Sequence, residues 1–164
     1  MKTFTKEQIQ ARVLQRGKPI GLDKFNWCDK TNTFTTDESN LVLDFNNIDG
    51  ITFKTGVFCT FKTGHGCTFK TGHGCTFKTW YGCTFDTWHG CTFKTGALCT
   101  FKTGALCTFD TGYGCTFDTW HACTFKTGKE CVVIRRDVYE VIELKECQTI
   151  KLNHFTTKGF TILN

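Results

Sequence analysis

Hydrophobic and polar residues alternate along residues 51–130 in an eight-residue unit that repeats ten times without an insertion. Position one is Cys in every unit but the first, position three is always Phe, positions two and five are always Thr, and position four is Lys or Asp. Alternation with period two, carried by β-branched and aromatic residues, is typical of strands. Positions one to five are therefore predicted to form a short strand with Cys, Phe and the second Thr facing inward, and the last three positions are predicted to form a corner.

Short units at a fixed period bury their apolar positions only by stacking on their neighbours, which predicts a β-solenoid. Two units per flattened coil are favoured, because each Phe then faces a Phe and each Cys faces an inward Thr. With three units per coil, Lys54, Lys78, Lys102 and Lys126 would form one column of like charge, which is unfavourable on adjacent strands. The expected fold is mainly β: a single-chain parallel β-solenoid of octapeptide repeats with a short N-terminal helix and loop cap and a C-terminal β cap.

The chain divides into three expected regions. Residues 1–42 form an N-terminal cap that contains an amphipathic helix, with Phe25 and Trp27 in the same lid. Residues 43–131 form the octapeptide-repeat solenoid, and residues 132–164 form a C-terminal β cap. Caps are expected because a solenoid otherwise ends in exposed strand edges and an open core.

The helix of the N-terminal cap is predicted from its capping and its apolar face. Thr5 and Gln8 have the spacing of a capping box. Ile9, Val13 and Leu14 then give the helix one apolar face, and a Gly and a Pro end the segment.

Twelve Cys suggest a secreted disulfide scaffold at first, but their placement argues against disulfides. Consecutive Cys of the repeat would lie on opposite faces, and Cys stacked on one face have poor geometry for bridging. The N-terminus is polar, so neither a signal peptide nor a membrane span is expected. We therefore expect reduced thiols that pack as small hydrophobic groups, in a reducing cytoplasm.

His65, His73, His89 and His121 each precede a Cys by two residues, which suggests a metal site. Because His would lie at the corner and the Cys would point inward, we expect surface residues, with no metal and no cofactor. No nucleophile and base pair, paired carboxylates or phosphate loop stands out of the repeat. Asp137, Glu140, Glu143 and His154 are read as solvated strand positions, and the protein is not expected to be an enzyme.

Nucleic acid is one alternative ligand, because the net charge is +5 and Lys residues alternate with aromatic corners. Asp86, Asp110 and Asp118 interrupt the Lys ladders, and two of them precede a Trp by two residues. Any binding of nucleic acid is therefore expected to be weak.

Ice is another alternative, because Thr ladders on a compact solenoid resemble those of insect antifreeze proteins. Those proteins present two parallel Thr ranks on one flat face. Here the strand reads TFKT or TFDT, so the outward partner of each Thr is Lys or Asp.

The opening segment at residues 9–34, the LVLDF segment, the CTFKTG and CTFDTW units and the CVVIRRDVYEVIEL segment occur in a fixed order. This layout resembles octapeptide-repeat proteins encoded by tailed bacteriophages, over essentially the whole chain. The resemblance implies a phage-encoded solenoid that would act in the host cytoplasm, and it implies no function. The chain also resembles pentapeptide-repeat proteins in architecture, but not in period, and its positive charge does not suit DNA mimicry.

Sequence variation is concentrated in the corners, so the expected function is that of a structural scaffold or protein-interaction module. The expected partner is another protein, and the chain itself is expected to be a monomer or a weak end-to-end oligomer. The candidate interaction surface comprises Trp80, Tyr81, Trp88, His89, Tyr113, Trp120 and His121.

Overall fold

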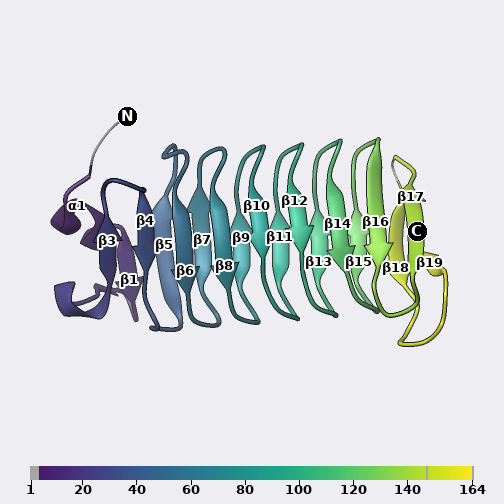
Figure 1. The fold of residues 1–164 in the computed structure, drawn as a ribbon, viewed down its shortest axis with the longest axis horizontal. Helices are drawn as coiled ribbons and strands as arrows, with labels where there is room; N and C mark the ends of the chain where they lie inside the picture. The colour runs from purple at the N-terminus through teal and green to yellow at the C-terminus, as the bar shows by residue number, and fades with distance from the viewer. Residues whose placement is uncertain (1–3, 147, 164) are drawn as a thin grey trace.

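The computed structural model describes residues 4–146 and 148–163, and these form a parallel β-solenoid of about six turns with one short α-helix (Figure 1). Two sheets face each other along the rod. The ten-stranded sheet contains, in spatial order, β2 (Lys18–Pro19), β1 (Val13–Gln15), β5 (Leu41–Phe45), β7 (Thr60–Thr63), β9 (Thr76–Lys78), β11 (Thr92–Lys94), β13 (Thr108–Asp110), β15 (Thr124–Lys126), β18 (Thr149–Leu152) and β19 (Phe160–Leu163). The nine-stranded sheet contains β3 (Asn26–Cys28), β4 (Thr33–Thr35), β6 (Thr52–Thr55), β8 (Thr68–Thr71), β10 (Thr84–Asp86), β12 (Thr100–Lys102), β14 (Thr116–Thr119), β16 (Cys131–Arg135) and β17 (Glu140–Leu144). No helix among the described residues is long and apolar enough to span a membrane.

The prediction of two octads per coil is confirmed by the strand register. Phe85 pairs with Phe69 on one neighbouring strand and with Phe101 on the other, each sixteen residues away. The intervening octads belong to the opposite sheet, so the ring of Phe85 meets that of Phe93 across the interior, with centroids 5.1 Å apart and planes at 75°.

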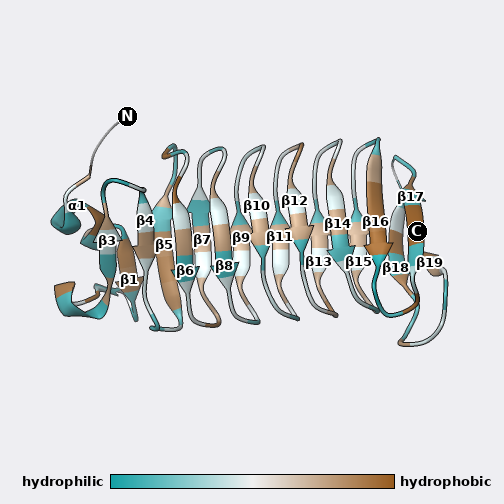
Figure 2. Ribbon diagram, viewed as in Figure 1, coloured by the Kyte–Doolittle hydropathy of each residue, from teal (hydrophilic) through white to brown (hydrophobic). Residues whose placement is uncertain are grey.

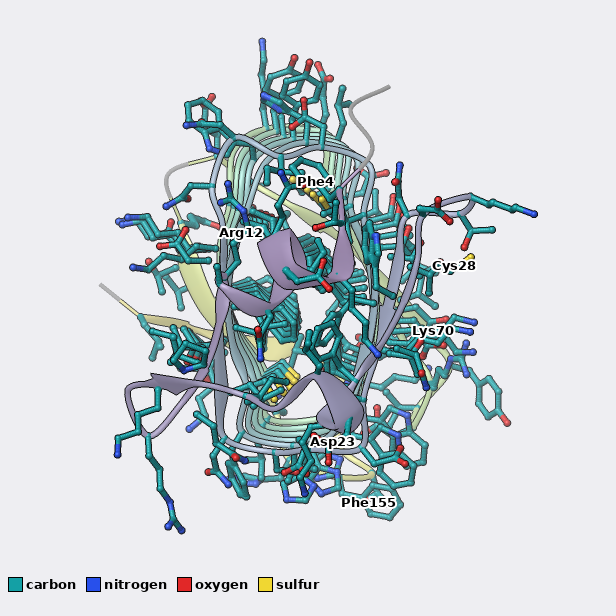
Figure 3. All side chains as sticks on the ribbon, turned by 90° about the vertical axis from the view of Figure 1, so that its left-hand side faces the viewer. Phe4, Arg12, Asp23, Cys28, Lys70 and Phe155 are labelled. Carbon is teal, nitrogen blue, oxygen red and sulfur yellow. The ribbon has the colours of Figure 1, made fainter. Side chains whose placement is uncertain are left out.

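The core is built from columns of identical residues. Phe rings of one sheet stack nearly parallel at coil spacing, as in Phe85–Phe101 with centroids 4.8 Å apart, and Figure 2 shows the apolar bands that recur at mid-strand. Viewed along the rod, the sulfur atoms of the repeat gather at the two ends of this core (Figure 3). The Cys123 thiol lies 3.1 Å from the hydroxyl oxygen of Thr119, so a small inward Thr lies beside the Cys, as predicted.

The N-terminal helix is present but shorter than predicted. Helix α1 spans Lys6–Gln10, and Thr5 and Gln8 form both hydrogen bonds of the capping box. Val13 and Leu14 were expected on this helix and instead lie on β1, which pairs antiparallel with β5. The helical prediction was wrong there because pairing covers the free edge of β5 and buries Val13 completely, which outweighs helix propensity.

The parallel coil begins before the first recognisable octad. β4 pairs in parallel with β6, which places Phe34 beside Phe53 in the Phe column, and β5 pairs in parallel with β7. Phe25 then stacks on Phe34 with centroids 5.2 Å apart, and the indole of Trp27 donates a hydrogen bond to the carbonyl of Phe4. A short 3₁₀ helix, η1 (Leu22–Lys24), lies in the same cap.

The C-terminal cap is built from antiparallel strands around a buried ion pair. β17 pairs with β16, and β18 and β19 extend the other sheet. Arg135 is fully buried and donates to both carboxylate oxygens of Asp137 and to the carbonyls of Thr157 and Gly159. The interpretation of Asp137 as a solvated position was therefore wrong, because the guanidinium provides hydrogen bonds that allow a carboxylate to be buried.

Candidate interaction surface

The corners of the repeat lie along two edges of the rod. The lower edge, where Phe155 lies in Figure 3, comprises residues 56–58, 72–74, 88–90, 104–106 and 120–122. The upper edge comprises residues 64–66, 80–82, 96–98, 112–114 and 128–130. The seven predicted surface residues are divided between these edges, so they do not form one site.

Each corner turns at position eight, where the backbone is left-handed. Gly90 has a φ of +69°, and Leu106, its counterpart on the next coil, has a φ of +60°. The N–H of position eight donates to the carbonyl of position seven on the following coil, as from Gly90 to Ala105 at 3.0 Å. This ladder of backbone bonds fixes the corners and leaves the side chains at positions six and seven free to vary.

Glycine at position six is explained by close approach to the preceding coil. A Cβ on Gly104 would lie 2.9 Å from the backbone nitrogen of His89, and one on Gly112 would lie 2.8 Å from that of Ala97. The N–H of Gly112 donates to the carbonyl of Gly96 at 3.2 Å, which is the regular bond at this position.

Tryptophan at position six disturbs this arrangement at two of its three positions. Among the described residues, no such bond joins Trp88 to Gly72 or Trp120 to Gly104, whereas Trp80 keeps its bond to Gly64 at 3.4 Å, the same length as the bond from Gly104 to Trp88. Trp88 and Trp120 nevertheless remain 67% and 43% exposed. A large exposed aromatic residue that displaces a backbone hydrogen bond breaks the local rules of the fold, and such exceptions are expected at functional positions.

The upper edge carries a compact aromatic cluster. The His65 ring lies 4.1 Å from that of Tyr81 and 5.3 Å from that of Trp80, measured between centroids. Tyr113 is exposed two coils further along and lies beyond Ala97. The structure therefore brings Trp80 and Tyr81 together and leaves Tyr113 apart.

The lower edge holds a cleft of about 420 Å³ between the other four predicted residues. Trp88 and His89 form one side, Trp120 and His121 form the other, and the coil between them contributes Gly104 and Ala105 to the floor. The two walls are two coil spacings apart, which is about 9.6 Å at the usual distance between neighbouring strands. The two small residues of one coil create this concave site.

Aromatic rings follow the lower edge on both sides of this cleft. The Phe58 ring contacts that of His73 with centroids 5.0 Å apart, and His73 stacks on His89 at 5.7 Å and 11°. Beyond the cleft, His121 contacts Phe155 of the C-terminal cap at 5.4 Å. The line of rings is interrupted at Ala105.

Charged side chains border the cleft on the nine-stranded sheet. Lys102 and Arg136 belong to its lining. Arg136 forms a bidentate ion pair with Asp118, and this hydrogen bonding raises the pKa of the guanidinium. Lys102 has no salt bridge with any described carboxylate.

The cleft combines aromatic, basic and hydroxyl groups. Its described lining offers aromatic faces, imidazole nitrogens, two cations and the hydroxyl-bearing side chains of Thr87 and Thr103. Among the described residues, no group of three or more His, Cys, Asp or Glu is placed to hold a metal ion.

The two sheet faces present regular ladders of polar residues. Each face carries one outward Thr rank at position two and one Lys or Asp rank at position four, while the Thr at position five points inward. On the ten-stranded sheet, Lys62, Lys78 and Lys94 stand in register on three consecutive strands.

The repeat thiols lie inside and are not part of the surface. Each column stacks at coil spacing, as shown by the backbone N–H of Cys107, which lies 3.4 Å from the Cys123 sulfur. The hydrogen bond with the Cys123 thiol and burial together raise the pKa of Cys107 to about 12, against a hydrogen bond with Cys91 that lowers it. Cys107 therefore remains protonated at neutral pH, and burial keeps the repeat thiols away from solvent.

A second cleft, of about 510 Å³, lies at the N-terminal end of the upper edge between Arg12, Asn46, Asn47 and Asp49. The Asp49 carboxylate accepts a hydrogen bond from the backbone N–H of His65, at 2.7 Å. This carboxylate therefore serves to hold the first corners in place.

Sequence reasoning missed six contributors to the lower-edge cleft, namely Thr87, Lys102, Thr103, Gly104, Ala105 and Arg136. Gly104 and Ala105 could have been found by comparing corners at spacing sixteen, which places a small pair between two Trp-His pairs. Arg136 lies beyond the regular repeat, and only the structure places it at the cleft. Comparisons of the chain with protein-family models, curated proteins and solved structures found no match.

Proposed function

We propose that the protein is a non-enzymatic scaffold or protein-interaction module, which presents ordered Thr, Lys and Asp ladders and aromatic corners to a protein partner. One observation carries the proposal. At Trp88 and Trp120 the fold lacks the regular corner hydrogen bond and leaves large aromatic side chains exposed. Exposed Trp residues beside a cleft are typical of interface anchors.

Several features support a rigid module. Columns of stacked Phe and Cys side chains run through the interior of the repeat. They hold the corner side chains at fixed spacings along the rod. Rigid display of an interface lowers the entropy lost on binding. The resemblance to phage-encoded repeat proteins and the buried thiols favour the host cytoplasm as the place of action.

Affinity capture after chemical cross-linking in cells that express the protein tests the proposal. We expect one protein to be recovered with the native chain and lost with a variant that carries Trp80→Gly, Trp88→Gly and Trp120→Gly. These variants restore the residue that the repeat has at most corners, so the fold is retained. Recovery of nucleic acid alone, or equal recovery of the protein with the triple variant, would refute the proposed function.

Weak nucleic-acid binding is the second candidate, and one observation favours it. Lys62, Lys78 and Lys94 form an uninterrupted cationic ladder, and Trp80 follows Lys78 by two residues at the upper edge. Such a ladder could contact successive phosphates while the indole stacks on a base. Filter binding over a salt series tests this: an affinity that falls steeply with salt and with Lys78→Ala supports it, and no retention at low salt excludes it.

A further inference from the structure

The aromatic line of the lower edge has one gap, and its size suits one ring. His89 and His121 lie on coils that are separated by the Ala105 coil. The His89 ring contacts His73 of the preceding coil and Trp88 of its own corner, and the His121 ring contacts Phe155. Inside the protein, Phe rings stack face to face at the spacing of one coil, with centroids 4.8 Å apart for Phe101 and Phe117. A ring above Ala105 would lie about one coil spacing from each wall, within the range preferred by aromatic pairs.

The chain itself provides a precedent for an aromatic side chain that reaches this edge from a loop. Phe155 lies between β18 and β19, outside the repeat, and its ring meets the His121 ring edge to face at 67°. Figure 3 shows Phe155 at the lower edge of the rod. His121 thus already binds an aromatic ring on one side, and the gap leaves its other side open.

Charge at the rim indicates what should accompany this ring. Arg136 is neutralised by Asp118. Lys102 lines the cleft and stands in register between Asp86 and Asp118 on the neighbouring strands, but among the described residues it forms no salt bridge with either carboxylate. An acidic group next to the ring would pair with Lys102 as the ring enters the cleft.

We propose that the gap between the Trp88–His89 and Trp120–His121 walls receives an aromatic side chain from a loop of the protein partner, with a carboxylate beside it that pairs with Lys102. The ring completes the aromatic line over Ala105, and the two indoles cover it. This inference rests on the proposed function, since it names the group by which a protein partner is held.

Selection from a displayed random-peptide library on the immobilised full-length protein tests the chemistry, with the Ala105→His variant used for counter-selection. This substitution fills the gap with the residue found at the same position on the neighbouring coils, so the fold should be retained. We expect peptides with a Trp, Tyr or Phe next to Asp or Glu. Enrichment of peptides without an aromatic residue, or equal binding to the Ala105→His variant, would overturn the proposal.

Fluorescence titration with the best selected peptide then identifies the residues. We expect Trp88→Ala and Trp120→Ala each to weaken binding at least tenfold, and Lys102→Ala to weaken it severalfold and to remove its salt dependence. Trp80→Ala, on the opposite edge, is the matched control and should change affinity less than twofold. Equal losses from the control would show that the peptide binds elsewhere.

The two proposals fail in distinguishable ways. A cellular partner that is still cross-linked to the Ala105→His variant, but lost with the variant that replaces all three Trp residues by Gly, would overturn this inference and leave the proposed function standing. If no protein partner is cross-linked to the native chain, both fail.

Discussion

Aromatic rings run along this rod both in the interior, as one line of Phe for each sheet, and on the lower edge, and the inner and outer lines obey different rules. Inside, every coil contributes one Phe to each sheet, and consecutive rings stack almost parallel from Phe53 to Phe117. On the lower edge the rings are His, Phe and Trp in irregular order, and Ala105 interrupts them.

The difference follows from what each line must do. An inner Phe touches neighbours on both sides and across the core, so a gap would leave a cavity and every coil is constrained alike. Corner side chains point into water, and the backbone ladder at position eight holds the turn whatever they are. The fold therefore tolerates different side chains at the corners of the edge, and the order of these side chains can serve recognition by a partner.

The largest effect is expected from breaking the inner line. Phe85→Ala removes a ring that stacks on Phe69 and Phe101, and it should lower the free energy of unfolding by about 3–5 kcal/mol. Chemical denaturation measures this. A loss below about 1 kcal/mol would mean that the core assignment is wrong.

Alkaline pH should weaken the same interior through the buried thiols. The raised pKa of Cys107, about 12 against an ordinary 9.0, means that the folded state keeps this proton after the unfolded state has lost it. Its hydrogen-bonded partner Cys123 has a lowered pKa, so these two shifts oppose each other. Burial raises the pKa of both thiols, and this effect leaves a loss of stability as the pH rises from 9 towards 12. Denaturation curves at pH 7, 9 and 10.5 test this, and a flat profile would contradict burial of protonated thiols.

Breaking the outer line should change stability little. Trp88→Gly restores the residue and the corner hydrogen bond of the other coils, a gain of about 1 kcal/mol that offsets the added chain entropy of Gly and the lost ring contacts. The net change in the free energy of unfolding should stay within about 1 kcal/mol, by the same denaturation assay. A loss above about 2 kcal/mol, well beyond that hydrogen bond, would mean that the indole is structural.

The smallest effect is expected on the outer face of a sheet. Lys94→Ala removes an exposed side chain between Lys78 and Asp110 and should cost less than about 0.5 kcal/mol. A loss comparable with that of Phe85→Ala would reverse the assignment of inner and outer positions.

Much of the fold could be predicted because the repeat states the same pattern ten times. The inward Phe, the two octads per coil and the capping box at Thr5 follow from alternation, charge pairing and local hydrogen bonding. Val13 and Leu14 could not be placed, because their strand depends on a free sheet edge that is distant in sequence. Asp137 was misread because its buried partner, Arg135, lies in an irregular segment with no period to indicate its direction.

The candidate site was predicted only in part. The aromatic corners were identified from their variability. The seven residues were predicted as one surface, whereas the structure divides them between two edges. The cleft depends on Gly104 and Ala105, which carry no reactive group. They matter because their small size leaves space between the two aromatic walls. Alternation alone does not reveal such a gap, whereas the stacking register does.

The central claim is that Trp88 and Trp120 serve recognition rather than stability. Measuring both the free energy of unfolding and the partner binding of the Trp88→Gly/Trp120→Gly double variant tests this claim. We predict a free energy of unfolding within about 2 kcal/mol of the native value, from two positions of about 1 kcal/mol each, together with loss of the cross-linked partner. Marked destabilisation with the partner still bound would contradict the claim.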